Sequence, residues 1–237
     1  MRLNSRMSLG LGGRRRAASD PSAALLAAFP YWFDSADATA LSTTLPNRGT
    51  AGGTVIEGAT PPVWGDGSID FVGGFDTLRL PAGARPTATA TSGDSTVVVA
   101  FTSTGSGGQS IWDTRSTATN GFGIYLSTDT MVVIVGGADG TKNRLDIDAR
   151  YRNGDVHVVA LSLSSGILTL WSDLEGRSAG VSTATGVGTI TQFATPSIGA
   201  YAYGNALDFV GGLKGVAVTN TYVSDTDLAT IAARYLP

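Results

Sequence analysis

Carboxylates decide whether this sequence could cleave a glycosidic bond, because that reaction usually needs two Asp or Glu side chains that flank the bond. Only two glutamates occur in the 237 residues, Glu57 and Glu175, and each stands alone in a turn-like segment. Asp146 and Asp148 share one face of an alternating segment, a pattern more typical of a solvated strand. His157, the only histidine, has no Ser or Cys partner at a spacing that would indicate nucleophilic catalysis. The sequence therefore predicts a protein that is not an enzyme.

The same two aspartates are the best candidates for holding a metal ion. Calcium takes about six to eight oxygen ligands, several of them from carboxylates and backbone carbonyls. Asp146 and Asp148 could supply part of such a set, with Asp113 and Asn120 contributing from the loop between two expected strands. These positions match no calcium-binding motif, and the absence of cysteine excludes a thiolate site. We therefore expect no cofactor, with a calcium site as the open alternative.

Two tyrosines are the predicted ligand contacts. Tyr201 and Tyr203 lie in the glycine-flanked segment 200–204, and loops of this kind often carry a binding surface. Aromatic rings can stack on the faces of sugars, although in sandwich folds most of them belong to the core. Trp171 lies in an alternating segment, so we expect it in the core.

Basic residues concentrate at the N-terminus. Residues 1–20 hold five arginines and one aspartate, a net charge of +4, whereas the remaining 217 residues hold 11 basic and 18 acidic residues, a net charge of −7. Arginine side chains pair well with carboxylates at protein interfaces. The segment is therefore predicted to anchor the protein to other proteins through Arg2, Arg6, Arg14, Arg15 and Arg16.

The sequence after residue 20 argues against two classes of partner, nucleic acids and membranes. It has no basic cluster on folded sequence, so we expect no direct nucleic-acid role. No apolar run reaches the roughly 18 residues that a membrane-spanning helix needs, so we expect no membrane partner.

Composition and spacing predict many short strands. The chain has 32 glycines and only 15% charged residues, and β-branched segments alternate with Gly and Ser turns. Segments 156–164 and 167–172 are expected to pair across a Ser-Ser-Gly turn, and segments 68–72 and 77–80 flank a Gly-Gly-Phe-Asp turn that predicts a hairpin. Helical crossovers between strands are missing, which favours an all-β, two-sheet antiparallel sandwich.

A short helix is expected near each end of the sandwich. Asp20 is a good N-cap, Pro21 suits the first helical position, and Pro30 is expected to end the first helix. Ser224 with Asp227 three residues later predicts the start of the C-terminal helix. The apolar residues of that helix recur at i, i+3, i+4 and i+7, namely Leu228, Ile231, Ala232 and Tyr235.

Several stretches together resemble the laminin-G-like branch of the concanavalin A-like lectin/glucanase superfamily. Residues 68–81 resemble its early hairpin, residues 153–161 (NGDVHVVAL) its His-containing strand, and residues 168–173 (LTLWSD) the following strand. Segment 197–200, then 209–218 and the helix from Ser224, resemble its ending. The resemblance implies a jelly-roll fold. The superfamily includes lectins, glucanases and calcium-binding domains. The paired carboxylates of the glucanases are missing here.

The N-terminal region is similar to the openings of bacteriophage virion proteins, such as minor tail and capsid-decoration proteins. The resemblance is carried by LGLGGRRRAA at 9–18, PYWFDSAD at 30–37 and LPNRG at 45–49. It implies a division into a basic anchoring arm with a short helix, 1–30, and a jelly-roll domain, 31–237.

Three hypotheses follow. The first is a non-enzymatic virion structural protein that is anchored by its arm to other capsid or tail proteins, forms a homo-oligomer or symmetric array, and displays the jelly roll for decoration or for adhesion to a host-surface glycan. The second is a free carbohydrate-binding, lectin-like domain of a bacterial surface or secreted protein. The third, a glycan hydrolase of the same fold, is disfavoured by the missing glutamate pair.

Overall fold

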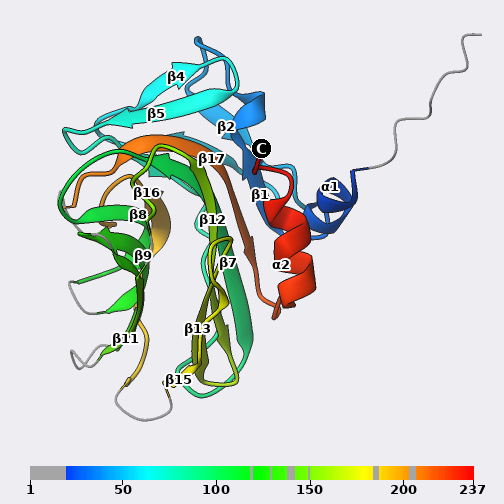
Figure 1. Cartoon of the computed structure of the whole chain (residues 1–237), viewed down its shortest axis with the longest axis vertical. Helices are drawn as coiled ribbons and strands as arrows, with labels where there is room; N and C mark the ends of the chain where they lie inside the picture. Colours follow the sequence, from blue (N-terminus) through cyan, green and yellow to red (C-terminus); the bar gives the residue numbers. More distant parts are fainter. Residues whose placement is uncertain are drawn as a thin grey trace, which may run out of the picture.

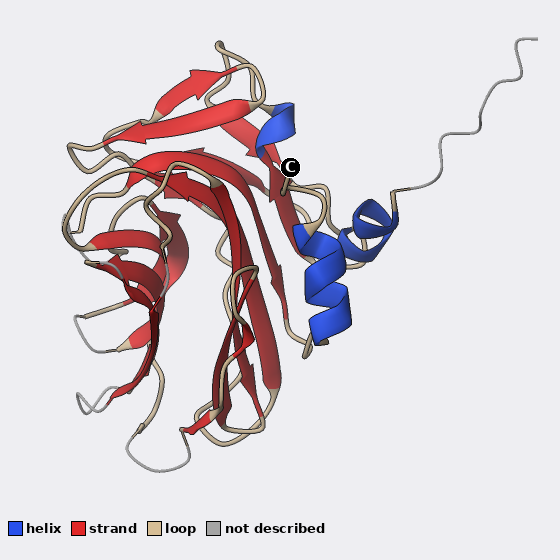
Figure 2. Cartoon of the chain, viewed as in Figure 1, coloured by secondary structure: helices blue, strands red, loops and turns tan. Residues whose placement is uncertain are grey.

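The protein is a two-sheet antiparallel sandwich with two helices on one side, as the computed structural model shows (Figures 1 and 2). The structure describes residues 20–117, 120–128, 130–137, 142–148, 150–183, 187–202 and 207–237, and within 142–148 it describes the side chain of Arg144 only. Every strand pair among these residues is antiparallel, which confirms the predicted fold class.

Sheet A contains the strands that lie beneath the helices. Its order among the described residues is β14 (Gly176–Arg177), β13 (Ile167–Ser172), β12 (Val156–Ser164), β7 (Asp94–Ser103), β17 (Val210–Thr219), β5 (Ser68–Val72) and β4 (Val63–Gly65). Two further strands join it at the side: β1 (Tyr31–Asp34) pairs with β17, and β15 (Val181–Ser182) pairs with β13. The predicted pairing of 156–164 with 167–172 is confirmed.

Sheet B faces sheet A across the core. Its order in the described chain is β11 (Lys142–Asp148), β10 (Thr130–Gly136), β9 (Gly121–Ser127), β8 (Gln109–Arg115), β16 (Gln192–Ile198), β6 (Leu78–Arg79), β3 (Thr54–Glu57) and β2 (Thr44–Pro46). A short 3-10 helix, η1 (Ser35–Asp37), follows β1.

The central strands of sheet A, β12, β7 and β17, are largely buried on both faces, and β7 shows why. Val97, Val99 and Phe101 point into the core between the sheets, whereas Val98 and Ala100 belong to a second apolar cluster on the outer face. Helices α1 (Pro21–Leu26) and α2 (Asp225–Ala232) cover that outer face (Figure 1). A strand with both faces covered needs an almost continuous apolar run. The sequence STVVVAFT at 95–102 has this character.

The helix starts follow the predicted caps. Asp20 Oδ1 accepts a hydrogen bond from the Ser22 amide at 3.0 Å, and Ser224 Oγ accepts one from the Asp227 amide at 3.2 Å. The prediction that Pro30 ends the first helix was wrong by one turn, because α1 ends at Leu26. The amides of Ala28 and Phe29 bond back by three residues, and Phe29 belongs to the apolar cluster beneath the helices.

The hairpin predicted for 68–80 was also wrong. Val72 pairs with Val210 in sheet A, whereas Leu78 pairs with Ile198 in sheet B. Three consecutive residues between the strands, 73–75, have positive φ angles of 96°, 76° and 68°. This backbone carries the chain from one sheet to the other, so β5 and β6 become neighbours in sequence but not in hydrogen bonding.

Candidate functional site

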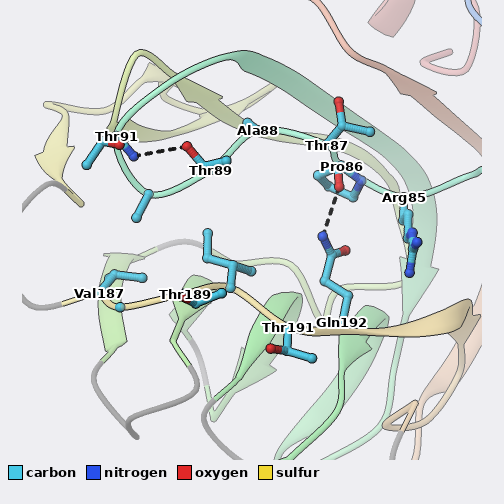
Figure 3. A pocket seen from close by; sticks show the side chains of 13 residues that line it. Arg85, Pro86, Thr87, Ala88, Thr89, Thr91, Val187, Thr189, Thr191 and Gln192 are labelled. Atoms are coloured by element: carbon cyan, nitrogen blue, oxygen red, sulfur yellow. Dashed lines mark hydrogen bonds between the residues drawn. The ribbon is translucent and has the colours of Figure 1, made fainter.

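An open groove lies between the segment that enters β7 and the segment that enters β16 (Figure 3). Residues 85–91 form one wall and residues 187–192 form the other, and the groove has a volume of about 700 Å³. We call it the threonine groove, because five of its lining residues are threonines: Thr87, Thr89, Thr91, Thr189 and Thr191.

The groove combines an apolar floor with a hydroxyl rim. Along one wall, exposed threonines alternate with Ala88 and Ala90, which are buried as part of the main core. On the other wall Val187 belongs to the same core, and Ile190 packs against it. The walls therefore present methyl groups inward and hydroxyl groups toward solvent.

Three hydrogen bonds hold the walls in place. Gln192 Nε2 donates to the carbonyl of Pro86 at 2.8 Å, across the groove (Figure 3). Asn120 Oδ1 accepts from the Thr191 amide at 2.7 Å and ties this wall to the neighbouring loop. The Arg85 guanidinium reaches the carbonyl of Phe193 at 3.4 Å. The groove is thus braced at one end by side chains rather than by strand pairing.

Most of the groove hydroxyls are available to a ligand. Thr89 Oγ1 is used locally, because it bonds Ser92 in a tight turn. Within the described part of the chain, the hydroxyls of the other four threonines make no hydrogen bond. A hydroxyl can both donate and accept. The rim therefore offers four two-way hydrogen-bonding groups to whatever enters the groove.

The described lining of the groove contains no carboxylate. Arg85 is the single ionisable residue among its described lining residues. Glu57 lies in sheet B and accepts from the Trp64 indole at 2.7 Å, and Glu175 is exposed in the turn between β13 and β14 of sheet A. The two glutamates thus lie in different sheets and do not flank a common site.

A second cluster lies on the outer face of sheet B, around one of the predicted ligand contacts. Asp113 is fully buried, and its carboxylate lies 2.6 Å from both Nε and Nη2 of Arg115. The Arg115 guanidinium in turn lies 4.1 Å from the centre of the Tyr201 ring. Tyr201 is therefore brought to a charged pair by tertiary structure, and its role as a ligand contact stays a prediction.

The Asp113 carboxylate is buried and is held by neighbouring donors. Burial raises its pKa to about 6, in spite of the opposing effect of Arg115 and of the Ala202 amide, which donates to Oδ1 at 3.2 Å. Both carboxylate oxygens are thus engaged, and Asn120 is engaged by Thr191, so neither is a free oxygen for calcium in this arrangement. The Asp-x-Arg spacing on one strand face was the signal for this pair, and sequence reasoning missed it.

The other predicted site residues are not tested. Asp146 and Asp148 lie on β11, where their backbones pair with Val132 and Thr130, but their side chains lie outside the described residues. Tyr203 and the five arm arginines, Arg2, Arg6, Arg14, Arg15 and Arg16, also lie outside them.

Across the described residues, no three His, Cys, Asp or Glu side chains are grouped so that they could hold a metal ion. No helix in the described part of the chain has the length and apolarity to span a membrane.

Comparison with known proteins identifies the architecture. No protein-family model matches the sequence, and no curated protein matches it. Among solved structures, the serotype D botulinum neurotoxin ligand-binding domain in complex with N-acetylneuraminic acid is similar, with a TM-score of 0.66 and 9% identity over 90% of this chain and 52% of that chain. This chain has the jelly-roll sandwich fold of that binding domain.

Other botulinum neurotoxin domains share the fold. The receptor-binding domain of the C/D mosaic serotype has a TM-score of 0.64 at 9% identity, over 87% of this chain and 51% of that chain. The binding domain of serotype DC in complex with SialylT has a TM-score of 0.64 at 9% identity, over 89% and 52%. The chain therefore spans about half the length of these neighbours. They are receptor-binding domains rather than catalytic domains.

Proposed function

We propose that this protein is a non-enzymatic jelly-roll binding module that recognises a saccharide in the threonine groove. The observation that carries the proposal is the groove itself, with its apolar floor and four uncommitted hydroxyls. Ligand sites of this size usually combine apolar walls with a few polar groups that fix orientation. A sugar presents the same two kinds of surface, C–H faces and hydroxyl edges.

The solved neighbours support a ligand-binding function, but they do not indicate where on this chain a ligand would bind. Two of them were solved with N-acetylneuraminic acid or SialylT, and both are about twice as long as the matched region. Their ligands belong to the whole domains. The case for a saccharide in this chain therefore rests on the groove.

The proposal includes anchoring through the arm, as in a bacteriophage virion protein that displays the module for adhesion to a host surface. The carboxylate of Asp20, the first described residue, accepts a hydrogen bond from Arg234 Nη1, just after the C-terminal helix, at 2.6 Å. Asp20 thus lies beside the helices that cover sheet A, whereas the groove is lined by residues 85–91 and 187–192. Anchoring and binding would use separate surfaces. A free lectin-like domain of a bacterial surface or secreted protein is the alternative, in which the arm carries no anchor.

A glycan array followed by isothermal titration calorimetry tests the binding half. Thr189 is exposed on the groove wall, so Thr189→Trp should block the groove and weaken the strongest array hit at least tenfold, equivalent to about 1.4 kcal/mol. The matched control is Thr44→Trp, an exposed threonine on β2 outside the groove, which should bind as the wild type does. Equal binding by wild type and Thr189→Trp would remove the groove from the proposal. Absence of any glycan hit would remove the function.

A further inference from the structure

We infer that the saccharide bound in the threonine groove carries a carboxylate group, and that Arg85 receives it. This inference rests on the proposed function and adds the chemical class of the ligand. It depends on three features of the described structure: the place of Arg85 at the end of the groove, the absence of a carboxylate partner for it among the described residues, and the neutrality of the other described lining residues.

Arg85 closes the braced end of the groove. Its side chain leaves the 85–91 wall and points toward the strand that follows the other wall (Figure 3). Its one hydrogen bond in the described structure is the long contact to the Phe193 carbonyl, 3.4 Å from Nη1. A guanidinium has five N–H donors in a planar fork. Most of these donors are therefore left for a ligand, while the half-exposed side chain remains in place.

Four of the other described arginines have the carboxylate partners that Arg85 lacks, whereas Arg79 and Arg152, like Arg85, donate to backbone carbonyls. Arg115 is paired with Asp113, and Arg177 is paired with Asp225. Arg48 and Arg234 each contact two aspartates. No aspartate or glutamate lies within ion-pair distance of Arg85 among the described residues. Among the described residues, the Arg85 guanidinium thus forms no ion pair that stabilises the fold.

Charge in the groove favours an anion. The lining contains one positive charge and no negative one, so the groove attracts a negatively charged group toward its braced end. The planar fork of arginine matches the two oxygens of a carboxylate, and such charge-assisted bonds are about twice as strong as neutral ones. The threonine hydroxyls along the walls would bond the neutral hydroxyls of the same ligand. A saccharide with a carboxylate at one end fits both parts of the groove.

Substitution of Arg85 tests the inference on one array of neutral, carboxylated and sulfated glycans. Arg85→Gln should lose carboxylated glycans by roughly tenfold or more and keep neutral ones unchanged. Arg85→Lys keeps the charge without the fork, so it should lie between the wild type and Arg85→Gln. Arg150→Gln, which removes an equal charge from an exposed position outside the groove, should bind as the wild type does. The melting temperatures of the three variants should match the wild type.

Titration of the strongest carboxylated glycan against its carboxyl-reduced counterpart gives the second readout. Reduction should weaken binding to the wild type and leave binding to Arg85→Gln unchanged. The inference fails if Arg85→Gln retains full affinity for carboxylated glycans, if Arg150→Gln loses as much, or if the wild type prefers neutral or sulfated glycans. In these cases a Thr189→Trp effect would still support the saccharide groove. If no glycan binds, the result contradicts both the proposed function and this inference.

Discussion

Asp34 Oδ2 lies 2.6 Å from Arg234 Nη2, although the two residues are 200 positions apart in the chain. Asp34 ends β1 and is 3% exposed, and Arg234 follows helix α2. The same carboxylate oxygen also accepts from Arg48 Nη1 at 3.2 Å. One buried carboxylate therefore ties the start of the sandwich to its C-terminal end and is shared by two guanidinium groups.

Replacement of this carboxylate should destabilise the whole sandwich. Asp34→Ala leaves two arginines without their shared partner, and breaking a buried ion pair costs about 3–5 kcal/mol. We expect a loss of unfolding free energy near the lower end of that range, measured by urea denaturation, because Arg48 retains Asp37. Asp225→Ala is the control, since Asp225 is mostly exposed in its pair with Arg177 and exposed pairs contribute about 0–1 kcal/mol. Equal losses in the two variants would contradict this account.

Gly123 makes room for the Asp113–Arg115 pair. A Cβ at this position would lie 3.1 Å from Asp113 Oδ2 and 3.2 Å from Arg115 Nε. Gly123→Ala should therefore lower the unfolding free energy by about 1–3 kcal/mol, the usual cost of overpacking. Gly52→Ala is the matched control, because a Cβ there meets no atom within 4 Å and its φ is not in the positive region. It should leave stability unchanged or raise it slightly. If Gly123→Ala leaves the unfolding free energy unchanged, the Asp113–Arg115 pair has room to shift away from the added methyl group.

The buried Asp113 predicts a specific pH dependence of stability. Its pKa in the folded protein is raised from 3.8 to about 6, so the folded state holds this proton more tightly than the unfolded state does. Asp113 therefore contributes stability that is fully present below pH 3.8 and is lost as the pH rises through about 6.

Asp113→Asn should remove this part of the pH profile. The slope of unfolding free energy between about pH 4 and pH 6.5 should become less negative in the variant, whatever its absolute stability. The variant also removes the buried partner of Arg115, so absolute stability is measured together with the slope. Asp66→Asn, at an exposed position, should keep the wild-type slope. Urea titrations at several pH values give both quantities, and an unchanged slope in Asp113→Asn would assign the proton to another group.

Removal of the arm should separate folding from anchoring. Deletion of residues 1–18 leaves the Asp20 cap and its bond to Arg234, so we expect an unchanged melting temperature. The +5 charge of the arginines is lost, so incorporation into particles should be abolished when the variant is expressed with the other virion proteins. Replacement of the consecutive arginines 14–16 by Ser should weaken incorporation and increase its salt sensitivity, because surface charge pairs are screened by salt. Full occupancy by the truncated protein would transfer the anchor to the jelly roll.

The sequence alone determined the features that depend on neighbours along the chain. The caps at Asp20 and Ser224 are local hydrogen bonds within three residues. The pairing of 156–164 with 167–172 follows from a short turn between them. Local pattern was enough for fold class because each of these choices is made within a few residues.

Tertiary structure alone decided which distant segments meet. Residues 68–72 and 77–80 look like a hairpin locally, but they do not pair with each other. Each pairs instead with a nearby preceding strand, β4 or β3, and with a strand more than a hundred positions away, β17 or β16. The groove depends in the same way on walls at 85–91 and 187–192, and the alternating Thr and Ala of the first wall gave no sign of the second. Strand pairing is set by the total burial that the whole chain achieves, and a local segment cannot report it. The unpaired charge of Arg85 becomes visible only once that packing is complete.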